Sequence, residues 1–92
     1  MAPPLRLRLY LAADALHSTR ALTNLREVLR VHAPRGHDLE IVDVMRHPER
    51  AVADGVLLTP TLLRLAPGPP AQIVGDLRDT ATLLRALGIG AR

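Results

Sequence analysis

The sequence has no cysteine among its 92 residues, which excludes disulfides, thiolate metal sites and thiol chemistry. It also has no lysine, so its twelve strongly basic residues are all arginines. These arginines are spread along the chain among nine carboxylates, and the net charge is only +3. The charge pattern is therefore not that of a concentrated basic tail or stripe.

Aromatic residues are almost absent, since Tyr10 is the only one. Without aromatic platforms on which bases could stack, and with scattered arginines, the sequence does not predict nucleic-acid binding. No apolar run approaches the ~20 residues of a membrane span. The first residues alternate Arg with Leu and lack the apolar centre of a signal peptide. We therefore expect no membrane partner and a cytoplasmic location.

Residues 1–92 are predicted to form a single domain, because a chain of this length has one small core. Residues 5–12 alternate leucine with Arg or Tyr, as a half-buried strand does. Residues 18–31 follow as a helix with Ser18 as N-cap. Residues 39–45 are short and nearly continuously apolar, which predicts a strand covered on both faces.

The second half of the chain contains one further helix, a hairpin and a last helix. Pro48 begins a helix that Gly55 ends. Two strands, 56–66 and 71–76, flank the turn "PGPP", and Pro60 interrupts the first of them near its start. The last helix has three features: Asp79 as N-cap, Ala81, Leu84 and Leu87 facing inward, and Gly88 at its C-terminal end.

The resulting order is β-α-β-α-β-β-α. The first crossover joins two parallel strands and is expected to be right-handed, and the short turn joins two antiparallel strands. The expected fold class is α/β and thioredoxin-like, a mixed four-stranded sheet with helices on both faces. In such folds a proline, usually cis, stands before the third strand, and Pro60 takes that place. The alternative is a trans proline at an edge strand.

No catalytic, metal or cofactor site is predicted. Ser18 has no evident base to activate it as a nucleophile, and the four histidines lack metal-ligand spacing. One alternative stays open, a cysteine-free, glutathione-binding transferase that uses Ser18 and Asp76. Tyr10 is expected either to pack in the core on the side away from the leucines or to contact a partner.

Four segments in order resemble the KaiB family of circadian clock proteins. The family opens with "LYVAGNTPNSxRAL" and continues with "VIDVLKNPQLA", "ILATPTL" and "IIGDL". The corresponding segments here are "LYLAADALHSTRAL" (9–22), "IVDVMRHPERA" (41–51), "LLTPTL" (57–62) and "IVGDL" (73–77).

The resemblance implies a protein-binding module without catalysis. Its partner would be a KaiC-like hexameric ATPase, recognised in one nucleotide state, and the complex could engage a KaiA-like protein. A sensor domain for another signalling partner, like that of the kinase SasA, is a further alternative. Family members switch between a thioredoxin-like form and a tetramer with a rearranged C-terminal half. Good helix formers in residues 80–88 and the prolines of 67–70 favour the thioredoxin-like form, expected as a monomer.

The resemblance also indicates a contact surface that is partly changed here. Glu40 and Gly55 stand where lysines are common in the family, and Ala71 and Gln72 replace an arginine pair. Charge changes of this kind alter association rate and partner choice. The expected partner-contacting positions are the following: Tyr10, Glu40, Gly55, Pro60, Arg64, Ala71, Gln72 and Asp76.

Overall fold

A computed structural model describes residues 5–13, 15–33 and 36–88. The elements are β1 (Leu5–Leu11), α1 (Leu16–His32), β2 (His37–Asp43), α2 (Pro48–Ala53), β3 (Thr61–Ala66), β4 (Ala71–Val74) and α3 (Thr80–Leu87). The predicted order of strands and helices is confirmed. In space the sheet order is β2-β1-β3-β4. β1 pairs in parallel with β2 and antiparallel with β3, and β4 pairs antiparallel with β3, so the sheet is mixed as predicted.

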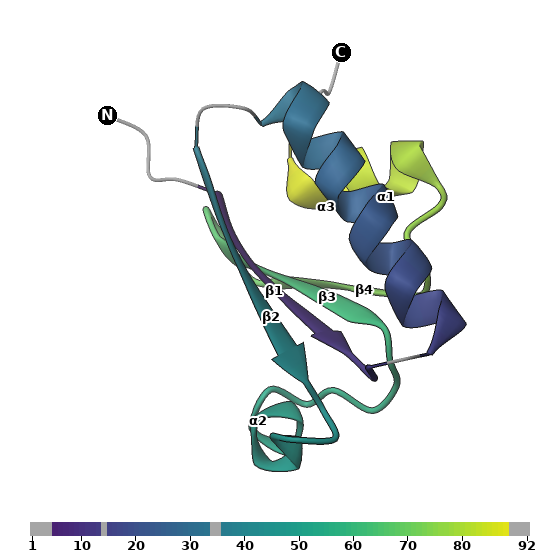
Figure 1. The fold of residues 1–92 in the computed structure, drawn as a ribbon. Coiled ribbons are helices and arrows are strands. Elements are labelled where there is room, and N and C mark those ends of the chain that lie inside the picture. Colours follow the sequence, from purple (N-terminus) through teal and green to yellow (C-terminus); the bar gives the residue numbers. More distant parts are fainter. Residues whose placement is uncertain (1–4, 14, 34–35, 89–92) are drawn as a thin grey trace.

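Alternation along β1 separates two apolar clusters. Leu5, Leu7 and Leu9 belong to the cluster that includes residues of α1 and α3, while Tyr10 belongs to the cluster that includes Ala51 of α2. α1 and α3 lie together on one side of the sheet, apart from α2 (Figure 1). The first cluster is the larger and includes Ala21, Leu25, Val28, Leu29, Leu62, Leu77, Leu83 and Leu87. The second contains only Tyr10, Val42, Ala51, Val56 and Leu63 as buried members. Helices therefore lie on both faces, but they cover them unequally.

The expectation that the second strand is covered on both faces is wrong. β2 is an edge strand that begins at His37, and only Val42 in it is buried. Its apolar run packs Leu39 against the larger cluster and Val42 into the smaller one, but leaves Ile41 exposed. A continuous apolar run is typical of a central strand, and here it stands at an edge.

Two predictions about the helices are wrong, and two others are confirmed. α1 begins at Leu16 with Ala15 in the N-cap position, so the prediction of Ser18 as N-cap is wrong. In α3 the buried residues are Leu83 and Leu87, and Ala81 is exposed instead of facing inward. Asp79 caps α3 as predicted, and Gly88 ends it with a φ of 72°. That left-handed conformation favours glycine.

Pro60 directly precedes β3, and the Thr59–Pro60 peptide bond is cis, as predicted. Residues 56–60 are not part of the strand, so β3 is shorter than the predicted 56–66. Its register pairs Leu62 with Leu9 and with Ile73. Within residues 5–13, 15–33 and 36–88, no helix has both the length and the apolar character needed to cross a membrane.

Candidate protein-binding surface

A hollow of about 330 Å³ lies between the start of α1 and the Pro60 loop. Its lining residues are His17, Thr59, Pro60, Gly75, Asp76 and Arg78. The backbone N–H of Gly75 donates to the carbonyl oxygen of Pro60 at 2.9 Å, which fixes the loop against the end of β4. The chain has no cysteine, so this hollow offers no thiol.

Ser18 is no substitute for a thiol in this hollow. Its side chain is only 2% exposed, and its Oγ accepts a hydrogen bond from the backbone N–H of Ala12 at 3.0 Å. The hydroxyl therefore joins the first turn of α1 to the end of β1. It is not among the residues that line the hollow, and the alternative of a Ser18-dependent transferase loses its nucleophile.

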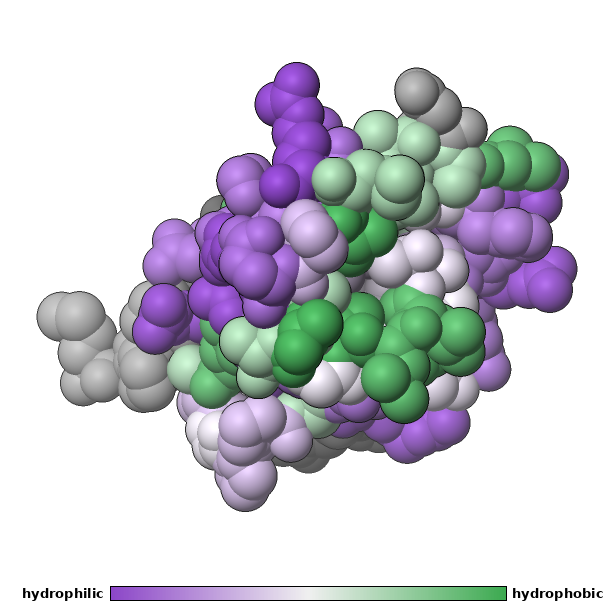
Figure 2. Space-filling model, turned by 90° about the horizontal axis from the view of Figure 1, so that it is seen from below, coloured by the Kyte–Doolittle hydropathy of each residue, from purple (hydrophilic) through white to green (hydrophobic). Residues whose placement is uncertain are grey.

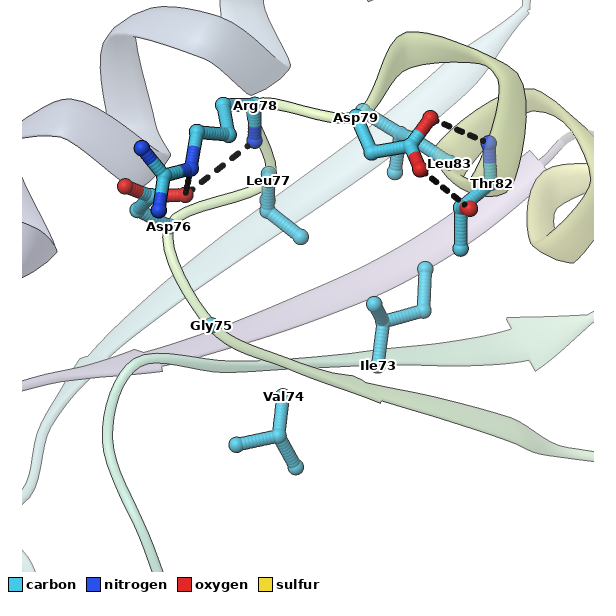
Figure 3. A pocket seen from close by; sticks show the side chains of 9 residues that line it. All are labelled: Ile73, Val74, Gly75, Asp76, Leu77, Arg78, Asp79, Thr82 and Leu83. Carbon is cyan, nitrogen blue, oxygen red and sulfur yellow. Dashed lines mark hydrogen bonds and ion pairs between the residues drawn. The ribbon is translucent and has the colours of Figure 1, made fainter.

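Asp76 lies beneath two basic side chains, and its own side chain is 12% exposed. Its Oδ1 accepts a 3.3 Å hydrogen bond from the backbone N–H of Arg78 and lies 3.6 Å from the Arg78 Nε (Figure 3). Its Oδ2 lies 3.9 Å from the Nδ1 of His17. Asn24 Nδ2 donates to the backbone oxygen of Asp76 at 2.9 Å. The residue therefore ties α1 to the segment between β4 and α3.

The connection from β4 to α3 carries a second hollow, of about 250 Å³. Figure 3 shows two of its lining residues, Ile73 and Val74, on β4, and the capping residues Asp79 and Thr82 above them at the start of α3. Asp79 accepts hydrogen bonds from the backbone N–H and the hydroxyl of Thr82. These bonds hold the pKa of Asp79 below its usual value. The polar groups at this edge are thus engaged in capping the N-terminus of α3.

A polar network joins β1, β2 and α2 on the other face of the sheet. Arg8 is at its centre: its Nε donates to Glu40 Oε1 at 2.8 Å and its Nη1 to Asp54 Oδ2 at 2.9 Å. Arg50 holds the same Glu40 carboxylate with both Nη atoms, at 2.6 and 2.9 Å. Hydrogen bonds from Arg50 and Arg8 lower the pKa of Glu40 to about 2.

Tyr10 completes this network from inside the smaller cluster. Its ring is fully buried, and its hydroxyl lies 2.9 Å from the carbonyl oxygen of Arg50 and also contacts Asp54 Oδ2. Burial, followed by the Asp54 contact, raises the pKa of Tyr10. The hydrogen bond from Tyr10 is the largest of the causes that lower the pKa of Asp54. Core packing is thus confirmed for Tyr10, and the alternative of a partner-contacting tyrosine is wrong.

Large apolar side chains gather on the face below α2. Met45, Val52, Leu57 and Leu58 are 77%, 79%, 92% and 64% exposed. A hollow of about 200 Å³ includes Leu57 and Leu58 in its lining, together with Val44, Ala51, Val56 and Thr59. Figure 2, seen from below, shows hydrophobic side chains in a band across this face, with hydrophilic ones on both sides. We call these residues the lower apolar patch; contiguous exposed apolar surface marks interaction sites.

The fold and the sequence are both similar to clock proteins. The KaiB domain family matches residues 8–89. The circadian clock oscillator protein KaiB of Prochlorococcus marinus is 40% identical over 83 residues, which cover 90% of this chain and 71% of that protein. The chain belongs to the KaiB family. A second KaiB, from Synechococcus elongatus, is 37% identical over 83 residues, which cover 90% of this chain and 81% of that KaiB.

Solved structures similar to this KaiB family member have thioredoxin-like folds. The N-terminal domain of Synechococcus elongatus SasA superposes with a TM-score of 0.77 at 25% identity, covering 96% of this chain and 87% of that domain. Mitochondrial thioredoxin 3 of Saccharomyces cerevisiae gives a TM-score of 0.75 at 16% identity, with 94% and 78% covered. The thioredoxin-like fold predicted from the sequence is therefore confirmed.

The contact positions expected from the KaiB resemblance do not form one cluster. Glu40 is held in the polar network, and Gly55, with a φ of 70°, follows Asp54 in open space. Pro60 and Asp76 line the hollow beside α1. The remaining three positions are on the hairpin: Arg64, Ala71 and Gln72.

Of these three positions, only Gln72 is exposed, while Arg64 and Ala71 are half-buried. Arg64 pairs with Ala71 across the strands, and its Nη2 donates to the carbonyl oxygen of Pro69 at 2.7 Å, which secures the turn. Its Nε is buried without a partner in the described part of the chain. Arg64 is therefore occupied in holding the hairpin.

Sequence reasoning missed the lower apolar patch. "VLL", residues 56–58, was assigned to a strand, where alternation would have turned one of the leucines inward. The only available signal was Pro60 itself, because a proline cannot donate to the ladder and strands begin at or after it. Among the described residues, no three carboxylate or imidazole groups converge to hold a metal ion.

Proposed function

We propose that this chain is a non-enzymatic, circadian-clock-type protein-binding module. Its partner is a KaiC-like hexameric ATPase ring, which it recognises in one nucleotide state. The observation that carries the proposal is the match to the KaiB domain over residues 8–89. Binding stabilises one nucleotide state of the ring by the difference between the binding free energies for the two states. The bound module therefore marks that state and lengthens the time that the ring spends in it. The complex then offers a site to a KaiA-like protein in the cytoplasm.

The lower apolar patch is the surface that we assign to the ring. Two of its four exposed side chains, Leu57 and Leu58, line a hollow able to take an apolar side chain of the partner. Several charges on the α2 side are tied within the chain, since Arg8 and Arg50 hold Glu40 and Asp54, and His47 lies 3.6 Å from Glu49. Arg46, next to Met45, is exposed at the edge of the patch. A partner that covers the patch would therefore meet mainly charges that are already paired, apart from Arg46. The hollow beside Pro60 shares Thr59 with this patch and extends the surface.

We propose further that residues 1–92 are one domain whose resting state is this thioredoxin-like form, a monomer. Three features support it: the Asp79 cap on α3, the Pro-rich turn between β3 and β4, and the network that attaches α2 to β1 and β2. An alternative tetramer would have to give up these contacts. Backbone chemical shifts that placed a strand across residues 82–89 would contradict the proposal.

The test is binding of the labelled chain to a KaiC-type ring loaded with ADP or with an ATP analogue. We expect tight binding to only one of the two forms. Leu57→Ser with Leu58→Ser should weaken it at least tenfold, because two exposed apolar contacts are lost. Val31→Ser, which changes an exposed residue on α1, is the matched control and should bind like the unmodified chain.

A folded chain that binds neither form of the ring would contradict the proposal. A glutathione titration tests the transferase alternative at the same time. A real glutathione site would shift amide signals near residues 18, 59 and 76, whereas the proposed module should show no saturable change there. If the ring fails and a histidine-kinase sensor partner binds instead, the alternative of a sensor domain takes its place.

A further inference from the structure

A fourth hollow, which shares no lining residue with the other three, lies between the last turns of α1 and the start of β2. Its volume is about 460 Å³, within the ~300–1,000 Å³ typical of small-ligand sites. Five residues line it: Arg26, Leu29, Arg30, His37 and Leu39. None of them takes part in the surface assigned to the ring.

The lining combines an apolar floor with a basic rim. Leu29 is buried and Leu39 is half-buried, and both belong to the larger apolar cluster. Arg26 and Arg30 are four residues apart on α1, so their side chains project from the same side of the helix. None of the five lining residues is acidic. The hollow therefore offers positive charge above hydrocarbon.

The hydrogen bonds of the rim leave donors available. Arg30 donates from Nε and Nη2 to the Glu27 carboxylate, at 3.3 and 2.6 Å, which leaves its Nη1 outside that pair. The Nδ1 of His37 lies 2.8 Å from the carbonyl oxygen of Ala33, which can only accept, so the proton is on Nδ1. This contact fixes the imidazole plane at the mouth of the hollow.

We propose that this hollow is a binding site for small amphiphilic carboxylates. The carboxylate is held by the guanidinium group of Arg26 and by the Nη1 of Arg30, beside His37, and the hydrocarbon body lies on Leu29 and Leu39. Arginine forks match carboxylate geometry better than any other side chain, and the leucine floor supplies burial at ~25 cal/mol per Å². An amphiphilic cation would contact the leucines but would be repelled by the arginines, and a purely polar anion would contact the arginines but leave the leucines uncovered.

The probe is sodium decanoate, titrated into the full chain and followed by backbone amide shifts and calorimetry. We expect saturable binding with shifts centred on residues 26–30 and 37–39. Decyltrimethylammonium has the same hydrocarbon with the opposite charge, and acetate has the same charge without it. Both should bind at least tenfold more weakly than decanoate.

Two substitutions identify the site. Arg26→Gln with Arg30→Gln should weaken decanoate binding at least tenfold, and Leu39→Ser should weaken it severalfold. Arg85→Gln, on α3 and outside the lining, is the matched control and should leave binding unchanged. Because binding to the ring uses another surface, the Arg26→Gln, Arg30→Gln variant should still bind the ring, which separates this test from that of the proposed function.

Three results would overturn the proposal. One is equal binding of the decyl cation, which would mean that the apolar surface alone is responsible. Another is unchanged decanoate affinity in the double arginine variant. The third is displacement of decanoate by an acidic, leucine-containing peptide at a much lower concentration, which would make the hollow a peptide-docking surface.

Discussion

The two faces of the sheet are stabilised in different ways. On the α1/α3 face, Leu9, Leu25 and Leu62 are fully buried in one continuous cluster made almost entirely of aliphatic side chains. On the α2 face the buried cluster is smaller, and a network of ion pairs and hydrogen bonds centred on Arg8 and Tyr10 lies beside it. One face depends on apolar area removed from water, the other on directional contacts between distant segments.

The same contrast appears in the helices themselves. α3 has eight residues and is capped locally by Asp79. α2 has six residues, and the His47 side chain in its N-cap position makes no capping hydrogen bond. Short helices are unstable without tertiary contacts. α2 is instead held from outside, through Arg50, Asp54 and the hydroxyl of Tyr10. The position of α2, and with it the lower apolar patch, thus depends on polar contacts.

The largest expected effect is on the α1/α3 face. Leu25→Ala removes a fully buried side chain from the larger cluster and should lower the free energy of unfolding by about 2–5 kcal/mol. Leu63→Ala, on the α2 face, should cost less, because Leu63 is 8% exposed and packs in the smaller cluster. Urea unfolding measures both. An equal or larger loss for Leu63→Ala would contradict the difference between the faces.

The second effect tests the network from within the core. Tyr10→Phe keeps the ring but removes the hydroxyl that contacts Asp54 and the carbonyl oxygen of Arg50. We expect a loss of about 1 kcal/mol, because two half-buried acceptors then lose a donor. A double-mutant cycle with Asp54→Asn should give a coupling free energy above ~0.5 kcal/mol. Additive losses would mean that the two side chains stabilise the fold independently.

The third effect concerns local capping. Asp79→Ala removes the acceptor for the backbone N–H of Thr82 and should destabilise the protein by ~1 kcal/mol. The loss should appear as faster amide hydrogen exchange in α3, with α2 unchanged. Asp38→Ala, an exposed acidic residue on β2, serves as the control and should have no effect on α3. Equal changes in α2 and α3 would show that the helices do not open separately.

The order of strands and helices could be predicted from the sequence because each signal was local. Leucine alternation defined β1, Pro48 and Gly55 bounded α2, and Asp79 and Gly88 bounded α3. The start of α1 was missed, since the expected capping serine lies inside the first turn and its hydroxyl bonds to Ala12 instead. Such a bond joins residues six positions apart and has no signature in a helix-start pattern.

The candidate site was harder to predict because it depends on long-range contacts. The difference at Glu40 from the lysine common in the family was visible in the sequence, but its pairing with Arg8 and Arg50 required the register of β1 against β2 and the placement of α2. The exposure of Leu57 and Leu58 likewise follows from where β3 begins. Neither property follows from hydrophobic periodicity.

The smallest expected effect is the pH dependence of the network. The pKa of Glu40 is about 2 in the folded chain, against an ordinary value of 4.5, so the ionised carboxylate favours the folded state. Its contribution is complete above about pH 4.5 and is lost as the pH falls towards 2. Because the Glu40 side chain is 45% exposed, we expect at most ~1 kcal/mol. Urea unfolding should therefore show that the unmodified chain has a higher free energy of unfolding than Glu40→Gln at pH 7, and that this difference shrinks as the pH falls to 2.5. A constant difference across that range would mean that Glu40 stabilises the fold by packing and not by its charge.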